Sequence, residues 1–234
     1  MQDKTVLVTG ASKGIGRAVA LALADQDLEI IITARNEKQL KEVAAEIDKQ
    51  GGHSRYTKAD FKDADQFQAL VNDIKTKNGK LDLLIHCAGV VYIGTCAEMP
   101  AEHWQETLHV NLTVPFLLTQ KCLPLMSAGS QIIFINSVAG KNAFREWSAY
   151  CASKAGLKTY ADVLRKEVQS RGIRVTTIFP SSVDTSMQDR LPYKWDRKKM
   201  LQVEDVARAV VYCYRQPSGV VIKEIDLESS SGVF

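Results

Sequence analysis

Short apolar runs rich in β-branched residues alternate along the chain with longer segments whose apolar positions recur at helical spacing. The short runs predict seven strands. They span Thr5–Thr9, Ile30–Thr33, His53–Lys58, Leu81–Ile85, Gln131–Ile135, Arg174–Phe179 and Val220–Leu227. The run His53–Lys58 has the weakest pattern. Among the helical segments Val203–Tyr214 is the clearest, because its apolar residues fall on one stripe.

The order of these segments predicts the fold class. Strands separated by helices pair in parallel through right-handed crossovers. We therefore expect an α/β Rossmann fold, with a doubly wound, seven-stranded parallel sheet and helices on both faces, as one domain over residues 1–234. The polar stretch at about 180–202 follows a strand, and open α/β sheets bind ligands beyond that end of their strands. It predicts a substrate loop.

Composition narrows the class of protein. The 234 residues are 45% hydrophobic and 24% charged, which fits a globular domain with a sizeable core. The net charge is only +3 and the basic residues are scattered, so we expect no nucleic-acid partner. The longest nearly apolar stretch, Leu112–Leu118, is far too short to cross a bilayer, so we expect no membrane association.

Cysteine and histidine usage indicates the compartment and the chemistry. The five cysteines are widely spaced and include no Cys-x-x-Cys pair, which is typical of the reducing cytoplasm. The four histidines show no metal-ligand spacing, since His103 and His109 would fall on different faces of a helix. We therefore expect a cytoplasmic protein without a metal site.

The first predicted strand leads into a glycine-rich turn and then into a helical segment. Backbone N–H groups at such a helix N-terminus bind phosphate, and glycines let a pyrophosphate approach closely. The predicted cofactor contacts in this turn are Gly10, Ser12, Lys13, Gly14, Ile15 and Gly16. Glycines alone could serve an ordinary tight turn. The strand–turn–helix context favours a dinucleotide site.

The residue after the second strand indicates which dinucleotide is bound. An NAD site usually has an acidic residue there for the ribose 2′-hydroxyl, but this chain has Arg35. A planar guanidinium suits a 2′-phosphate, and Lys13 supplies a second positive charge. Both residues favour NADP(H). The alternative is that both are solvated surface charges.

A second group of residues points to proton transfer. Tyr150 and Lys154 lie four apart on one face of a helical segment. An ammonium beside a phenol stabilises the phenolate, so we expect the pKa of Tyr150 to be lowered from about 10. Ser137 follows a strand thirteen residues earlier, where its hydroxyl could hold a substrate carbonyl, and Asn111 lies in the preceding helical stretch. The Tyr–Lys pair alone would not identify an active site.

Together with the glycine turn, these residues resemble the short-chain dehydrogenase/reductase family, in register from Thr5 to about Thr185. The resemblance implies a catalytic tetrad of Asn111, Ser137, Tyr150 and Lys154. Tyr150 would exchange the substrate proton, Ser137 would steady the carbonyl oxygen, Lys154 would also hold the nicotinamide ribose, and Asn111 would support a water relay. Besides Tyr150 and Lys154, it implies cofactor contacts at Asp60, Phe61, Ala88, Gly89, Pro180, Val183 and Thr185.

The chain departs from the family pattern in two places. His86-Cys87 stands where the family has two asparagines, and Ser181 stands where it has glycine. The first change removes amide hydrogen bonds thought to brace the central strands, and the second stiffens the nicotinamide-side loop. For Cys87 and Cys151, buried packing is favoured over a catalytic role.

We expect an NADP(H)-dependent oxidoreductase that reduces a small ketone or aldehyde to an alcohol, reversibly. By the same resemblance, helices at Trp104–Met126 and Ser148–Arg171 predict a homodimer or homotetramer. Two alternatives stay open: a dinucleotide-sensing regulator without turnover, and a 3-oxoacyl-thioester reductase. The second would use basic residues near the pocket entrance, here Arg190, Lys194, Arg197, Lys198 and Lys199. A solvated loop is the plainer interpretation of that cluster.

Five aromatic residues are candidates for the wall of the substrate pocket. They are Tyr92, Phe144, Trp147, Tyr193 and Trp195. They could surround an apolar or aromatic ketone, and each could equally be ordinary packing. The sequence does not decide between these possibilities.

Overall fold

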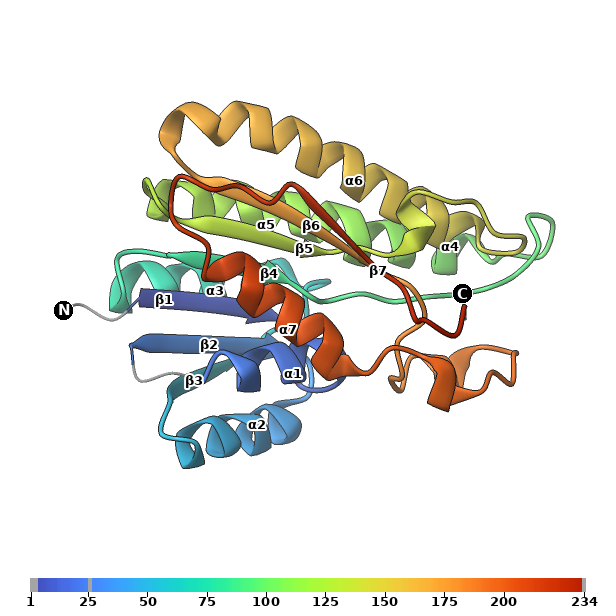
Figure 1. The fold of residues 1–234 in the computed structure, drawn as a ribbon, viewed down its shortest axis with the longest axis horizontal. Coiled ribbons are helices and arrows are strands. Elements are labelled where there is room, and N and C mark those ends of the chain that lie inside the picture. Colours follow the sequence, from blue (N-terminus) through green and yellow to red (C-terminus); the bar gives the residue numbers. More distant parts are fainter. Residues whose placement is uncertain (1–3, 25–26, 233–234) are drawn as a thin grey trace.

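The computed structural model describes residues 4–24 and 27–232, which form a seven-stranded sheet with helices on both faces (Figure 1). The strands are β1 Lys4–Thr9, β2 Leu28–Ala34, β3 His53–Lys58, β4 Leu83–His86, β5 Gln131–Ile135, β6 Arg174–Pro180 and β7 Glu224–Leu227. The helices are α1 Gly14–Ala22, α2 Glu37–Lys49, α3 Ala64–Lys77, α4 Ala101–Leu108, α5 Val114–Cys122, α6 Ser148–Val168 and α7 Val203–Tyr214.

Alternation along the strands divides the core into two layers. On β1, Val6 and Val8 pack with α1, α2 and α7 on one face of the sheet, whereas Leu7 packs with α3, α5 and α6 on the other. Successive strand residues point to opposite faces. Both faces of this sheet are covered (Figure 1), so its central strands are buried at nearly every position. This explains the continuous apolar runs in the sequence.

All seven strands pair in parallel, in the order β3-β2-β1-β4-β5-β6-β7. The order reverses between β1 and β4, where Val6 lies opposite Leu83 and Val8 opposite Ile85. Crossovers leave the two sides of such a junction in opposite directions, so a crevice opens beyond its carboxyl ends. The topology thus fixes where a ligand can enter.

The predicted fold class is confirmed, together with the existence of every predicted strand. The bounds of His53–Lys58, Gln131–Ile135 and the helix Val203–Tyr214 agree with the structure. The last strand is shorter than predicted and begins at Glu224. Val220 and Val221 lie in the connection that precedes it and are 43% and 44% exposed, so their apolar character does not mark a buried strand.

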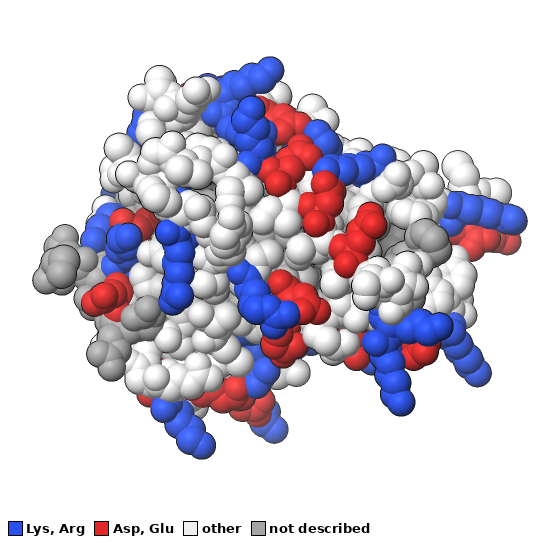
Figure 2. Space-filling view, viewed as in Figure 1, with Lys and Arg blue, Asp and Glu red and all other residues white. Residues whose placement is uncertain are grey.

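Charged residues of both signs are interspersed over the face of the molecule in Figure 2. None of the described helices combines the length and apolar character needed to cross a bilayer. Residues 4–24 and 27–232 also contain no cluster of three or more His, Cys, Asp or Glu side chains suited to a metal ion.

His86 ends β4 in the core, where it replaces one of the family's asparagines. Its Nε2 lies 3.0 Å from Thr119 Oγ1 on α5, and its ring stacks on Phe134 of β5 at 4.8 Å between centroids. The contact of His86 with Thr119 thus links β4 to α5. Burial lowers the pKa of the imidazole from 6.5 to about 3, because a cationic ring would lose its hydration there.

We expect this histidine to make stability fall with acid. Below pH 6.5 the unfolded chain binds a proton at His86, whereas the folded protein binds it only near pH 3. The free energy of unfolding therefore decreases by about 1.4 kcal/mol per pH unit over that window, or about 2 kcal/mol at pH 5. Urea unfolding of wild type and of His86→Asn, each at pH 7.5 and pH 5, measures this loss.

The histidine at the exposed start of β3 provides the matched control. His53→Gln should leave the loss between pH 7.5 and pH 5 as it is in wild type, whereas His86→Asn should reduce it by about 2 kcal/mol. Equal losses in wild type and His86→Asn would contradict the assignment to His86.

Candidate active site

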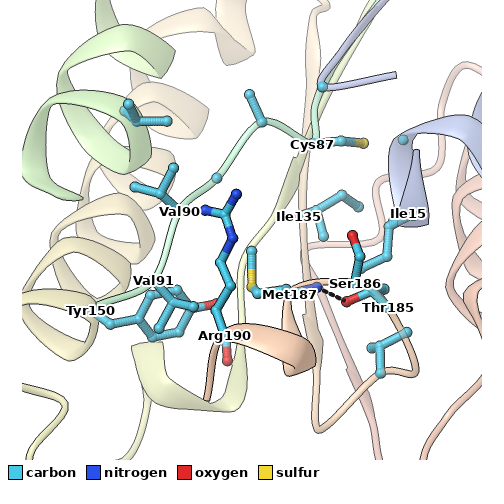
Figure 3. A pocket seen from close by; sticks show the side chains of 18 of the residues that line it. Ile15, Cys87, Val90, Val91, Ile135, Tyr150, Thr185, Ser186, Met187 and Arg190 are labelled. Atoms are coloured by element: carbon cyan, nitrogen blue, oxygen red, sulfur yellow. Dashed lines mark hydrogen bonds between the residues drawn. The ribbon is translucent and has the colours of Figure 1, made fainter. Parts of the chain in front are cut away.

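A cavity of about 710 Å³ lies at the carboxyl ends of the strands, beside the β1–β4 junction (Figure 3). Of the predicted site residues, all except Asn111 line it. They are Gly10, Ser12, Lys13, Gly14, Ile15, Gly16, Arg35, Asp60, Phe61, Ala88, Gly89, Ser137, Tyr150, Lys154, Pro180, Val183 and Thr185. The fold therefore brings together residues from segments far apart in the sequence.

The glycine turn closes one wall of the cavity by backbone-to-backbone contact. Gly10 has a φ of +65°, and a Cβ on it would lie 2.8 Å from Ala88 Cα. A Cβ on Gly16 would lie 2.4 Å from the carbonyl oxygen of Gly10. Thr9 Oγ1 accepts hydrogen bonds from the N–H groups of Cys87 and Ala88 at 3.1 and 3.2 Å. The turn is thereby joined to the end of β4.

Two cations lie where the cavity meets the ends of β1 and β2. Arg35 directly follows β2 and is exposed, and Lys13 is the exposed residue before α1. Neither side chain forms a hydrogen bond or ion pair with another described residue. Asn36 caps α2 by accepting a hydrogen bond from Gln39 N–H at 3.1 Å, which orders the backbone beside Arg35. The arrangement suits a phosphate group.

The segment after β3 forms the neighbouring wall. Asp60 Oδ1 accepts a hydrogen bond from Lys62 N–H at 3.1 Å, and Asp60 N–H donates to Gln66 Oε1 at 2.9 Å. His109 Nε2 lies 3.1 Å from the carbonyl oxygen of Phe61. These contacts place Asp60 and Phe61 at the rim.

Ser137, Tyr150 and Lys154 meet deep in the cavity. Ser137 follows β5, and α6 carries Tyr150 and Lys154 one turn apart. Lys154 Nζ lies 5.7 Å from the centroid of the Tyr150 ring and donates to the carbonyl oxygen of Ile135 at 3.0 Å. Tyr150 and Lys154 are only 8% and 5% exposed, so both polar ends lie away from bulk water.

Burial controls the acidity of both groups. It raises the pKa of Tyr150 to about 12, although the hydrogen bond with Ser137 lowers it. Burial also lowers the pKa of Lys154 to about 8, against the opposing charge effect of Cys87. The expectation of a lowered pKa for Tyr150 is therefore wrong for this structure, because the loss of hydration outweighs the neighbouring groups. At neutral pH the phenol keeps its proton.

Asn111 lies behind the cavity wall, in a π-helical turn at His109–Thr113. Its Nδ2 donates to the carbonyl oxygen of Val90 at 2.9 Å and to Ser153 Oγ at 3.1 Å. Its Oδ1 accepts from Val90 N–H at 2.9 Å. The side chain thus holds the segment after β4 against α6. Single-turn π-helices occur often at functional sites.

Sequence reasoning missed Asn136, which links Ser137 to Lys154, two of the predicted catalytic residues. Its Oδ1 accepts from Ser137 N–H at 2.9 Å, and its Nδ2 donates to the carbonyl oxygen of Lys154 at 3.1 Å. Its own N–H donates to Ile178 on β6 at 2.8 Å. An asparagine directly between an apolar strand and Ser137 was the available signal, because a buried amide requires partners.

The two departures from the family pattern also reach the cavity. Cys87 lines it, and burial raises the pKa of its thiol to about 12, so the thiolate needed for nucleophilic chemistry is disfavoured. Ser181 lines it as well. Cys87 therefore supplies no reactive group at neutral pH.

Four of the five candidate aromatic residues line the cavity: Phe144, Trp147, Tyr193 and Trp195. Trp147 packs edge-on against Tyr150, and Tyr193 stacks on Trp195. Tyr92 does not belong to this wall. Its ring stacks on His103 at 3.9 Å, because its hydroxyl donates to Glu106 Oε2 on the same helix.

The substrate loop begins where β6 ends and is fastened at its base. A parallel bridge joins Val183 to Leu201, and Asp184 N–H donates to Leu201 at 2.8 Å. Of the basic cluster on this loop, only Arg190 lines the cavity. Arg197 instead pairs with Asp184 and Asp189.

Comparison with known proteins agrees with this geometry. The family described as short chain dehydrogenase matches residues 4–195. An uncharacterized oxidoreductase of Staphylococcus saprophyticus is 33% identical over 96% of this chain and 97% of its own length. Sepiapterin reductase of Chlorobaculum tepidum is 33% identical over 97% of this chain and 96% of its own.

Solved structures show the same likeness in three dimensions. A short chain dehydrogenase of Shigella flexneri 2a, complexed with NADP, has a TM-score of 0.88 and 30% sequence identity. The match covers 97% of this chain and 97% of that one. The resemblance inferred from motifs therefore extends over nearly the whole fold.

The contact between Gly10 and Ala88 leads to a stability prediction. In Gly10→Ala the new Cβ meets backbone at 2.8 Å and the residue keeps a positive φ. We expect about 1–2 kcal/mol for the left-handed conformation and about 1–3 kcal/mol more for the overlap. Urea unfolding at pH 7.5 measures the sum.

Gly79→Ala separates these two costs. Gly79 has a φ of +68°, and a Cβ there would meet no described atom within 4 Å. Gly79→Ala should therefore lower the free energy of unfolding only by the cost of the left-handed conformation. Equal destabilisation of the two variants would show that close approach does not constrain the turn.

Proposed function

Because this chain belongs to the short-chain dehydrogenase family, we propose that it is an NADP(H)-dependent oxidoreductase that reduces a ketone or aldehyde to an alcohol, reversibly. One observation carries the proposal. Ser137, Tyr150 and Lys154 meet in a cavity whose opposite wall is the glycine turn. A proton donor and a dinucleotide cradle therefore face the same space. The name of the reductase from Chlorobaculum tepidum agrees with the direction of the reaction.

The residues present fit a dinucleotide. The turn is a cradle that a Cβ at Gly10 or Gly16 would fill, and the N-terminus of α1 offers N–H groups for a pyrophosphate. Asp60 and Phe61 would contact the adenine, and Pro180, Val183 and Thr185 the nicotinamide end. When bound, the cofactor would supply the hydride for reduction and accept it in the reverse reaction.

Tyr150 would deliver the proton that completes carbonyl reduction. The raised pKa keeps the phenol protonated at neutral pH, as a general acid requires. Ser137 would donate a hydrogen bond to the same substrate oxygen and so hold the carbonyl beside the phenol. Charge that develops on that oxygen would be stabilised by donors already held in place, because Tyr150 is buried.

Lys154 would serve the cofactor ribose and the phenol together. An ammonium has three N–H donors, and only one is engaged by the carbonyl of Ile135 in the described structure. The remaining donors are free for a ribose hydroxyl. Once Tyr150 has given up its proton, the nearby positive charge would stabilise the phenolate.

Arg35 and Lys13 support a preference for NADP(H) over NAD(H). Both are cations at the cavity, and neither is neutralised by a described partner. A 2′-phosphate would pair with the guanidinium through two oxygens. The Shigella flexneri structure, which contains NADP, agrees with this choice.

Several expectations stay predictions: a single catalytic domain over residues 1–234, cytoplasmic location, and a homodimer or homotetramer. Exposed Trp104 on α4 and Phe116 on α5 support association. Size-exclusion chromatography with light scattering measures the assembly. The thioester alternative has less support, because four of the five basic residues proposed for it lie outside the cavity lining. A regulator without turnover is the outcome if no carbonyl compound is reduced.

We expect Tyr150→Phe to abolish turnover while NADPH binding stays nearly unchanged. The substitution removes the proton donor and preserves the ring, so turnover should fall at least about 100-fold. NADPH oxidation at 340 nm, with a panel of ketones, aldehydes and diketones, measures turnover, and fluorescence titration measures the dissociation constant. Tyr212→Phe, on the exposed face of α7, is the control and should behave as wild type. Retained activity in Tyr150→Phe would refute the assignment.

We expect Arg35→Asp to raise the KM for NADPH by about 10- to 150-fold, because a charged hydrogen-bonding partner is lost and a repulsive charge is introduced. The KM for NADH should change much less. Lys38→Asp makes the same charge change on exposed α2 outside the cavity lining and should leave both constants nearly unaltered. An unchanged preference in Arg35→Asp would overturn the phosphate role.

A further inference from the structure

The cavity carries more positive charge than the cofactor and catalytic roles use. Six cationic side chains line it against a single carboxylate, that of Asp60. The cations are Lys13, Arg35, Lys62, Arg145, Lys154 and Arg190. Such a surplus favours an anion beyond the dinucleotide phosphates.

Five of the six have a partner or a proposed role. Lys13 and Arg35 face the 2′-phosphate, and Lys154 serves Tyr150. Lys62 pairs with Glu106 at 2.9 Å, and the highly exposed Arg145 lies 3.6 Å from Glu146. Only Arg190 is left over, since its side chain forms no hydrogen bond or ion pair with any residue that the structure describes.

Arg190 is held next to the catalytic tyrosine. It ends the 3₁₀ turn Gln188–Arg190 on the substrate loop, between Met187 and Leu191. Both neighbours pack against the small apolar cluster that contains Val91 and Tyr150. The backbone position of Arg190 is therefore fixed by contacts with the wall that carries the proton donor.

The guanidinium points into the substrate side of the cavity. In Figure 3 the Arg190 side chain extends between Val91 and Met187 toward Val90, on the same side as Tyr150. Ile15 and Thr185, at the glycine turn, lie on the opposite side of the view. Arg190 is exposed and lines the cavity, so its guanidinium is accessible to a ligand that enters from solvent. A planar fork of donors matches a carboxylate.

We propose that Arg190 determines specificity by binding a carboxylate of the substrate, so that the enzyme prefers oxo acids over neutral carbonyl compounds. This inference rests on the proposed reductase function. One guanidinium balances one monoanionic carboxylate, whereas a phosphate monoester would retain unpaired charge. The aromatic side chains on the other walls contact the apolar remainder of the substrate.

Matched pairs of acid and ester test the proposal. We expect wild type to reduce benzoylformate or acetoacetate with a higher kcat/KM than the corresponding methyl ester. Arg190→Gln should raise the KM for the acid by about 10- to 150-fold and change that of the ester less than about threefold. Arg190→Lys keeps the positive charge but lacks the paired donors of the planar guanidinium, so its KM for the acid should lie between those of wild type and Arg190→Gln. Arg145→Gln removes a rim charge and is the matched control.

Two kinetic results would overturn the proposal. An equal decrease of kcat/KM for acid and ester in Arg190→Gln would show that Arg190 only maintains the conformation of the loop. A rise in the dissociation constant of NADPH that matches the rise in KM would show that Arg190 binds a cofactor phosphate instead. A wild-type preference for the esters would overturn it as well.

A binding measurement separates this proposal from the reductase assignment. Calorimetric titration of the complex with NADP⁺ uses phenylacetate and the neutral phenylacetamide, which need no turnover. Phenylacetate binding that Arg190→Gln abolishes, in a protein that reduces no carbonyl compound, would uphold the anion site and refute the reductase. Absence of phenylacetate binding in an active enzyme would refute the anion site alone.

Discussion

The hydrogen bonds of Thr9 Oγ1 with the backbone beyond β4 are the constraint on which the cavity depends. They join two strands that are distant in sequence and neighbours in the sheet. The junction is also where the strand order reverses. A side chain at Gly10 or Gly16 would force the backbones apart. Without this approach, neither the cradle at α1 nor the wall at Ala88 could form.

The end of the cavity that holds Tyr150 and Lys154 is built by a second set of buried polar contacts. Asn136 links the strand that presents Ser137 to the helix that presents Lys154, and Asn111 links that helix to Val90. These amides touch no reacting atom, but they hold the residues that would. Burial there raises the pKa of Tyr150 and lowers that of Lys154.

Local signals were sufficient for the fold and for the residues at strand ends. Apolar runs located the central strands because both sheet faces are covered, and the glycine turn was visible because close backbone contact tolerates no side chain. The spacing of Tyr150 and Lys154 predicted that they lie together, and both line the cavity. The position of Asn136 after an apolar strand signalled a buried amide, but its partner Lys154, like the contact of Ser153 with Asn111, is brought near only by the complete fold.

Charge environment was the least predictable property. The pKa of Tyr150 rises because of burial, which a Tyr–Lys spacing does not report. Similarly, the sequence does not distinguish the basic residues at 190–199 from one another. In the structure Arg190 lines the cavity, whereas Arg197 forms ion pairs with Asp184 and Asp189 on its own loop. Tyr92 was one candidate for the pocket wall, whereas its hydrogen bond to Glu106 holds it elsewhere.

The close approach of Gly14 to Thr185 limits how early in synthesis of the chain the cavity can form. A Cβ on Gly14 would lie 3.5 Å from Thr185 Cγ2, so the start of α1 touches the segment beyond β6. A nascent chain leaves the ribosome N-terminus first. The residues of the glycine turn are therefore made long before Thr185, and the proposed dinucleotide site is complete only once residue 185 has been made. Until then, the early strands must persist on their own packing.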